Sequence, residues 1–247
     1  LLMSEAIRLP DLMLVTGVSR IDVLSARLAA SPCLQRGGLP WVAHFNCNSA
    51  AMAFNATLDS RPRAEWLVWA HQDVFLPEGW DRRFAAALRD ARFRFPNLAV
   101  AGAYGISGAG RSAVRAGHVL DRGQLLKEPA ALPCPVNSLD ELLLAVRVDS
   151  PLRMDPALGF DFYATDLVLQ AQEAGLASAV VDAYCEHWSD TPSSGPMPRE
   201  LFERVKANGH AFELKWAHRL PVSTPCFEIT RPGDVAAFVD SIAWVAP

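Results

Sequence analysis

The sequence predicts an α/β fold, a three-layer sandwich in which helices flank a mostly parallel central sheet. Two observations carry this prediction. Short apolar runs recur along the chain, as in strands that are covered on both faces, and runs with helical spacing lie between them. The clearest apolar run, 66–70, ends at His71, Gln72 and Asp73. Because ligands bind beyond the carboxyl ends of such strands, a site is expected here.

The composition is that of a globular protein. Hydrophobic residues make up 51% and charged residues 20% of the 247 residues, which excludes a disordered chain. We predict a single domain over 1–247, with its core at about 10–190 and a peripheral segment at 191–247. The formal net charge of −4 gives no reason to expect nucleic-acid binding.

Signals for a membrane or an oxidising compartment are not found in the sequence. No apolar run approaches the ~18 residues of a transmembrane segment, and the first residues lack a secretory pattern. The five cysteines are dispersed without a CxxC pair, which is typical of reduced thiols rather than of disulfides or a zinc site. A cytoplasmic location is therefore expected.

The first part of the chain predicts two strands joined through a helix. Residues 12–18 and 41–45 are short apolar runs, which indicates strands. Between them, residues 21–30 place apolar side chains at spacings of three and four, the pattern of an amphipathic helix. Two glycines and two prolines predict a loop over 32–40.

Helices and strands continue to alternate along the chain. Ser49 is placed to cap a helix at 50–58, because its hydroxyl can accept a hydrogen bond from a free backbone N–H. A second helix is predicted at 81–91, and 96–106 is expected to form one buried strand that becomes glycine-rich. Residues 107–122 indicate a loop or hairpin with anion-binding potential, although a solvated insertion is the simpler interpretation.

The segment 136–147 allows two interpretations. It can be a helix capped by Ser138, with Glu141 at the capping-box position. It can equally be a strand that carries Asp140 and Glu141 at its mouth, and periodicity does not separate the two for a short apolar run.

Residues 165–174 predict a helix capped by Thr165 and ended by Gly175. Asp166 then lies in the first turn, where a carboxylate complements the helix dipole as well as it could serve catalysis. A last strand is predicted at 177–184, followed by His187. Further helices are expected near 198–208 and 233–245, after a loop at 189–197.

The polar end of the central run suggests metal chemistry. His71 and Asp73 are two residues apart, so in an extended segment both side chains point to one face. An imidazole and a carboxylate in this arrangement can hold a divalent metal, which in turn can hold a diphosphate. The alternative is a solvated strand end without a ligand.

The order of these motifs resembles the family-2-like glycosyltransferases of the GT-A fold, particularly a bacterial branch whose metal motif reads H-Q-D. The resemblance covers about 12–190. It is carried by Ser49, Phe54 and Asn55, by His71, Gln72, Asp73 and Val74, by Leu139, Asp140 and Glu141, by Phe160, Asp161, Phe162, Tyr163 and Asp166, and by His187.

This resemblance implies a nucleotide-sugar donor, a glycan or other hydroxyl acceptor, and Mn²⁺ or Mg²⁺ as cofactor. Asp73 would be the main metal ligand and His187 would complete the metal site. His71 stands where the family has an aspartate, which leaves open whether it binds the metal, the ribose or neither.

Other roles are implied by position. Asp166 would be the general base of an inverting transfer, although Thr165 stands where the family has a glutamate. Asp140 and Glu141 would lie near the sugar or the acceptor. The remaining residues expected near the donor are Thr16, Val18, Ser19, Asn55 and Gln72.

Two other functional classes stay open. The departures at His71 and Thr165 are compatible with a nucleotide-sugar-binding protein that has lost catalysis. A nucleotidyltransferase would use a similar sheet, but it would carry a glycine-rich, basic signature after the first strand, and 17–20 is a poor version of one.

Overall fold

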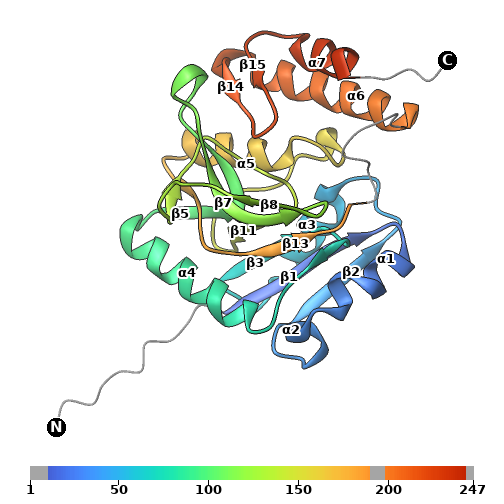
Figure 1. Ribbon diagram of the computed structural model, residues 1–247, viewed down its shortest axis with the longest axis vertical. Helices are drawn as coiled ribbons and strands as arrows, with labels where there is room; N and C mark the ends of the chain where they lie inside the picture. Colours follow the sequence, from blue (N-terminus) through green and yellow to red (C-terminus); the bar gives the residue numbers. More distant parts are fainter. Residues whose placement is uncertain (1–10, 190–197, 243–247) are drawn as a thin grey trace.

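Seven strands form a central sheet within the described residues, 11–189 and 198–242, of the computed structural model (Figure 1). From one edge to the other they are β2 (Trp41–Phe45), β1 (Leu12–Val18), β3 (Trp66–Ala70), β11 (Leu143–Arg147), β5 (Leu98–Gly102), β12 (Ala177–Val180) and β9 (Cys134–Pro135). β1 pairs in parallel with β2 and β3, and β5 with β12, whereas β11 runs antiparallel between β3 and β5. The sheet is mostly parallel, as predicted.

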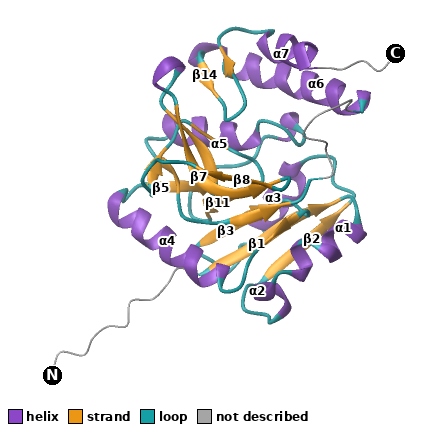
Figure 2. Ribbon diagram, in the orientation of Figure 1, coloured by secondary structure: helices purple, strands orange, loops and turns teal. Residues whose placement is uncertain are grey.

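Helices cover both faces of this sheet (Figure 2). One face carries α1 (Ile21–Ala26), α2 (Pro32–Gln35) and α4 (Trp80–Arg94), and the other carries α3 (Ala50–Asp59) and α5 (Tyr163–Glu173). In β3, Trp66 and Val68 pack into the first of these two apolar clusters, and Leu67 and Trp69 pack into the second. Successive side chains of a strand point to opposite faces, which is why a strand buried on both has an unbroken apolar sequence. The predicted α/β fold is confirmed.

A second sheet brings together segments that are far apart in the sequence. Its strands are β10 (Ser138–Leu139), β6 (Tyr104–Ser107), β7 (Val114–Asp121), β13 (Cys185–His187) and β4 (Val74–Phe75), with β8 (Gln124–Lys127) paired to β7. In this register, His187 lies opposite Val74 on one side and opposite Asp121 on the other. The end of β13 therefore lies beside the turn that contains His71 and Asp73.

The C-terminal elements pack against α5 (Figure 1). They are α6 (Arg199–Lys215), β14 (Val222–Ser223), β15 (Glu228–Ile229) and α7 (Asp234–Ile242). Phe212 and Trp216 of α6 form an apolar cluster with Phe162 and Leu169. The described part of this segment thus packs on one side of α5 through a third apolar cluster. Within the described residues, no helix combines the length and apolar character that crossing a membrane requires.

Several predicted boundaries differ from the observed ones. The helix predicted at 21–30 ends at Ala26 and is followed by the 3₁₀ helix η1 (Leu28–Ala30). The loop predicted at 32–40 begins with α2, because proline is accommodated in the first turn of a helix. The strand predicted at 96–106 is two strands, β5 and β6, which belong to different sheets.

The segment 107–122 belongs to a hairpin and is not a loop alone, because most of it is β7, which pairs antiparallel with β6. The 3₁₀ helix η2 (Gly110–Ser112) lies at the turn between the two strands. For 136–147 the strand interpretation holds: β10 and β11 flank a turn that carries Asp140 and Glu141. The last predicted strand, 177–184, ends already at Val180. Residues 190–197 of the loop predicted at 189–197, and the end of the helix predicted at 233–245, lie outside the described residues.

The two predicted helix caps have different outcomes. Ser49 caps α3, and its Oγ accepts a hydrogen bond from the backbone N–H of Met52 at 3.1 Å. Thr165 is not a cap, because α5 begins two residues earlier, after Phe162, whose φ is 62°. The hydroxyl of Thr165 instead lies 2.7 Å from that of Ser138. The 3₁₀ helices η3 (Pro156–Leu158) and η4 (Ala217–Arg219) complete the described elements.

Candidate metal centre and adjoining cavities

His71, Asp73 and His187 converge on one point. Each offers one ligand atom, and these atoms lie within 4.8 Å of one another. His71 and Asp73 come from the turn after β3, and His187 comes from β13. The pairing of β13 with β4 produces this convergence, and the backbone N–H of Trp188 reinforces it by donating to the carbonyl of Asp73 at 3.0 Å. All three predicted metal ligands are thus brought together.

The tautomer of His71 follows from the hydrogen bonds of Tyr163. The Tyr163 hydroxyl donates to the carbonyl of Glu141 at 3.0 Å and accepts from Nε1–H of Trp69 at 2.9 Å. Its only hydrogen is then used, so the 2.7 Å contact with Nε2 of His71 requires the imidazole to be the donor. A neutral imidazole with its proton on Nε2 has a free electron pair on Nδ1, the form that ligates a metal.

His187 is oriented by a carboxylate. Its Nδ1 lies 2.8 Å from Oδ1 of Asp121, and its Nε2 lies 3.4 Å from Oδ1 of Asp73. A carboxylate behind a histidine fixes the orientation of the ring and increases its basicity toward a metal on the other nitrogen. Asp121 was not singled out in the sequence, where it lies in the glycine-containing segment before β8.

The three groups differ in their protonation. Burial lowers the pKa of His71 to about 4, and the charge of His187 adds to this effect. Burial opposes the charged form of His187 too, but hydrogen bonds to Asp121 and Asp73 outweigh it and raise its pKa to about 9. Burial also raises the pKa of Asp73, yet the hydrogen bond to His187 and the charges of both histidines bring it below its ordinary value. A proton on His187 therefore occupies the position that a cation would take.

The donor set fits a divalent transition metal. Two imidazoles and one carboxylate suit Mn²⁺, Fe²⁺ or Zn²⁺, whereas Mg²⁺ prefers oxygen ligands alone. Of the two predicted cofactors, the residues present fit Mn²⁺ better than Mg²⁺.

A cavity of about 420 Å³ adjoins the metal ligands. It lies where β1, β2 and β3 end, the position at which α/β sheets bind ligands. Its lining residues are Gly17, Val18, Ser19, Asn46, Cys47, Trp69, His71, Gln72, Asp73, Phe160 and Arg204. We refer to it below as the metal-side cavity.

Three of the predicted donor-binding residues have structural roles. Oε1 of Gln72 accepts from the backbone N–H groups of Ser19 and Arg20, at 3.1 and 3.0 Å, and its Nε2 donates to the Ser19 hydroxyl at 2.8 Å. Gln72 thereby attaches the loop after β1 to the turn after β3 that carries His71 and Asp73, which we refer to as the metal turn. Thr16 is fully buried, and Asn55 uses both ends of its amide on the backbone of Met154, at 2.8 and 3.1 Å. Neither Thr16 nor Asn55 lines the metal-side cavity, and their contact with a ligand stays a prediction.

Asp140 and Glu141 border a second cavity, of about 270 Å³. We refer to it as the apolar cavity, and its composition is described below. Burial, together with the charges of Asp161 and Asp140, raises the pKa of Glu141 well above its ordinary value. Among the described residues, the Glu141 carboxylate has no ion-pair partner.

Asp166 does not face either cavity. It is fully buried, and its carboxylate accepts from Nε1 of Trp216 at 2.8 Å and from Nε2 of Gln170 at 2.6 Å. Nζ of Lys215 lies 2.7 Å away. Burial raises the pKa of Asp166, and these contacts oppose the rise only in part. Lys215, at the end of α6, and Trp216 thus cover the carboxylate that was expected to face an acceptor, and its role as general base stays a prediction.

Arg204 and Asp161 connect the two cavities. Nε and Nη2 of Arg204 each lie 3.0 Å from one carboxylate oxygen of Asp161, and Nδ2 of Asn208 adds a third bond at 2.7 Å. Arg204 lines the metal-side cavity, and Asp161 lines the apolar cavity. Arg204 gave no signal in the sequence, because it is one of two arginines in a helix that carries no motif.

Comparisons with known proteins give limited likenesses. No protein-family model matches the chain. A curated protein of Fuscovulum blasticum, described as ATP synthase subunits region ORF 6, is 30% identical over 137 residues, which are 52% of this chain and 53% of the relative. The chain thus spans about half the length of that relative.

Three solved structures illustrate the similarity in three dimensions. The mannosyltransferase PcManGT from Pyrobaculum calidifontis, in complex with GDP-Man and Mn²⁺, aligns with a TM-score of 0.47 and 11% identity over 95% of this chain and 70% of that chain. GalNAc-T7 with UDP, GalNAc and Mn²⁺ aligns with a TM-score of 0.48 and 10% identity, over 85% of this chain and 51% of that one. For S. aureus TarS 1-349 in complex with UDP-GlcNAc the TM-score is 0.44, with 10% identity, and the alignment covers 81% of this chain and 65% of that chain.

Proposed function

We propose that the chain transfers a sugar from a nucleotide-diphosphate donor to an acceptor hydroxyl, with metal assistance and with inversion at the anomeric carbon. One observation carries the proposal: two histidines and Asp73 present ligand atoms to one point beside a cavity of about 420 Å³, which His71 and Asp73 line, beyond the carboxyl ends of the central strands. The motif order, with His71, Gln72 and Asp73 in the place of the metal motif, agrees with it.

The metal-side cavity supplies what a nucleotide diphosphate requires. His71, Asp73 and His187 would hold Mn²⁺, which as a Lewis acid stabilises the negative charge that gathers on a departing diphosphate. Arg204 brings a guanidinium to the same cavity, and a guanidinium binds phosphate oxygens through paired donors. Gln72 holds the loop of Val18 and Ser19 in place at the cavity wall.

Glu141 is the carboxylate that we assign as general base. It borders the apolar cavity, its carboxylate is not engaged in an ion pair with any described residue, and its pKa is raised by burial and by neighbouring acids. A base with a raised pKa accepts a proton efficiently near neutral pH. Asp166, which the motif order favours, is engaged by Trp216 and Lys215 instead.

The transfer is a single displacement. The acceptor hydroxyl loses its proton to the Glu141 carboxylate while its oxygen forms the bond to the anomeric carbon. The bond from that carbon to the diphosphate oxygen breaks, and the diphosphate leaves with the electron pair. Attack on the face opposite the leaving group inverts the configuration.

The alternative is a protein that binds a nucleotide sugar without transferring it. The burial of Asp166 favours this alternative, because the aspartate in the expected position of the base is unavailable. A nucleotidyltransferase is disfavoured, since Arg20, the one basic residue of the loop after β1, pairs with Asp22.

A thermal-shift experiment tests the donor site without knowledge of the acceptor. The purified chain is titrated with GDP, UDP, ADP and CDP, with and without Mn²⁺, in wild type, Asp73→Asn and Asp90→Asn. Asp90 is an exposed residue of α4 and serves as the matched control. We expect one nucleotide to raise Tm only with Mn²⁺, in wild type and Asp90→Asn but not in Asp73→Asn.

Two results would contradict the proposal. Absence of stabilisation by every nucleotide would remove the donor site, and stabilisation by Fe²⁺ or Zn²⁺ alone would indicate another class of metal protein. Transfer itself is then followed by release of the nucleotide diphosphate in the presence of acceptors, with Glu141→Gln separating an enzyme from a binding protein.

A further inference from the structure

The apolar cavity has a composition unlike that of the metal-side cavity. Its walls are formed by side chains of β10, α5, α6, the β14–β15 loop and α7. The apolar members include Leu139, Phe162, Phe202, Val205, Phe227 and Phe238. Four of them are phenylalanines, and the rings of Phe227 and Phe238 stack with centroids 4.0 Å apart. Such walls favour the flat face of a ring over a hydrated chain.

The charges at this cavity all have one sign. Asp140, Glu141 and Asp161 line it, and none of its described lining residues is a lysine, an arginine or a histidine. The guanidinium of Arg204 reaches Asp161 but lines the other cavity. Arg204 offsets the charge of Asp161, but an anion placed here would still meet Asp140 and Glu141, which form no ion pair with a described residue, and this costs free energy in a partly desolvated site.

The acidic end of the cavity is close to the metal ligands. The carbonyl of Glu141 accepts a hydrogen bond from the hydroxyl of Tyr163, which also contacts His71. An occupant of the apolar cavity would therefore present its polar end to Glu141, with the metal-side cavity next to it.

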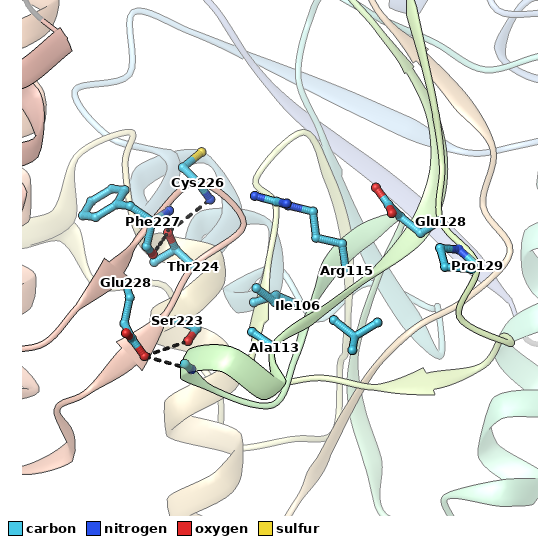
Figure 3. A pocket seen from close by; sticks show the side chains of 12 residues that line it. Ile106, Ala113, Arg115, Glu128, Pro129, Ser223, Thr224, Cys226, Phe227 and Glu228 are labelled. Carbon is cyan, nitrogen blue, oxygen red and sulfur yellow. Dashed lines mark hydrogen bonds between the residues drawn. The ribbon is translucent and has the colours of Figure 1, made fainter.

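A neighbouring cavity of about 450 Å³ is a weaker candidate for a site (Figure 3). Figure 3 shows Arg115 facing the loop of Thr224 and Cys226 across it. Its main polar groups are already engaged: Arg115 donates to the carbonyl of Pro225 at 2.9 Å, and Glu228 accepts from the backbone N–H of Gly110 at 3.0 Å.

We propose that the apolar cavity binds the acceptor, and that the acceptor is an uncharged alcohol carried on an aromatic body of one or two rings. The role of this alcohol as acceptor rests on the proposed function, but its binding needs neither donor nor metal. The volume of about 270 Å³ corresponds to roughly nine waters at ~30 Å³ each, which is room for one or two rings, and the phenylalanine walls favour a ring over a chain.

The test measures binding of three probes by isothermal titration calorimetry without nucleotide or metal. The probes are 2-(2-naphthyl)ethanol, 2-naphthylacetate and methyl β-D-glucopyranoside. We expect the neutral naphthyl alcohol to bind at least tenfold more tightly than either other probe. Phe202→Ala and Val205→Ser should each weaken it about fivefold, while Phe93→Ala, at an exposed phenylalanine of α4, should leave it unchanged.

Glu141→Gln tests the role of charge separately. It removes one carboxylate from the rim, so 2-naphthylacetate should gain severalfold in affinity while the alcohol changes by less than twofold. Equal binding of the alcohol and the acetate to wild type, or tighter binding of the glucoside, would overturn the proposal. Unchanged binding of the alcohol in both Phe202→Ala and Val205→Ser would also overturn the proposal. If Phe202→Ala does not fold, the result for Val205→Ser alone decides. If no nucleotide binds but the alcohol does, the proposed transferase function is contradicted, whereas the proposed alcohol site is supported.

Discussion

The phenol oxygen of Tyr163 lies 2.7 Å from Nε2 of His71. Tyr163 stands in the first turn of α5, and His71 directly follows β3, so this bond joins the metal turn to the opposite helical layer. Both Trp69 and the carbonyl of Glu141 use the same oxygen. One hydroxyl thus fixes the tautomer of a metal ligand and the position of the residue that we assign as base.

Tyr163→Phe should therefore weaken the metal site without removing a ligand. Loss of the partner behind a ligating histidine typically costs 10–100-fold in metal affinity, and we expect a loss in that range for Mn²⁺. Trp69 and the Glu141 carbonyl would lose a buried partner, which should cost about 1–3 kcal/mol of unfolding free energy. Calorimetric titration and urea unfolding measure the two effects. Tyr184→Phe, at a tyrosine beside His118, is the control. If this control binds Mn²⁺ as weakly as Tyr163→Phe does, the bond between Tyr163 and His71 does not support metal binding.

Asp166 should prove to be a stabilising residue and not the base. Asp166→Ala leaves the buried indole N–H of Trp216 without an acceptor and removes one of the two carboxylates that pair with Lys215, which should cost about 1–3 kcal/mol, and Asp166→Asn should cost less. Transfer by the folded fraction of Asp166→Asn should stay close to wild type, whereas Glu141→Gln should lose about 10²–10⁴-fold. The reverse pattern, with Glu141→Gln active and a well-folded Asp166→Asn inactive, would return the base to Asp166.

His187 should make the stability of the metal-free protein depend on pH. Its pKa rises from 6.5 to about 9 through Asp121 and Asp73, although burial opposes the rise. The folded state then binds a proton more tightly than the unfolded state. The resulting stabilisation is complete below pH 6.5 and is lost as the pH rises through 9, by at most roughly 3 kcal/mol.

Urea unfolding with a chelator at pH 6 and pH 9.5 measures this dependence. His187→Gln should show a smaller loss between the two pH values than wild type. His218→Gln, which removes an exposed histidine that pairs with Glu173, should behave as wild type does. The same pH dependence in all three proteins would mean that His187 is not the titrating group.

Local sequence patterns predicted the parts of the site that one strand supplies. The apolar run of β3 identified a strand covered on both faces, and its polar end supplied His71 and Asp73. The residues that hydrogen-bond to the ligands were not predicted, because they come from other elements. Asp121 reaches His187 only through the pairing of β7 with β13, and residue spacing carries no information on that register.

The start of α5 and the surroundings of Asp166 differ from the expectation for separate physical reasons. Phe162 starts α5 from a left-handed conformation that sequence rules assign to glycine or asparagine, so Thr165 appeared to be the better cap. Asp166 is correctly placed in the first turn, but its environment is set by Trp216 and Lys215 of the remote C-terminal elements. A tertiary contact of this kind has no local signal.

Arg204 provides a test of the donor site that is independent of the metal ligands. Its guanidinium forms two bonds to Asp161 and reaches the metal-side cavity, where it is the one arginine or lysine among the described lining residues. Arg204→Gln should weaken binding of the nucleotide diphosphate roughly tenfold, the value of one charged hydrogen bond. Arg204→Lys should recover only part of this, because an ammonium keeps the charge but not the paired geometry. Arg199→Gln, in the exposed first turn of α6, should bind as wild type does. If Arg204→Gln keeps full affinity while Mn²⁺ still binds, Arg204 orients Asp161 toward the apolar cavity and does not contact the donor.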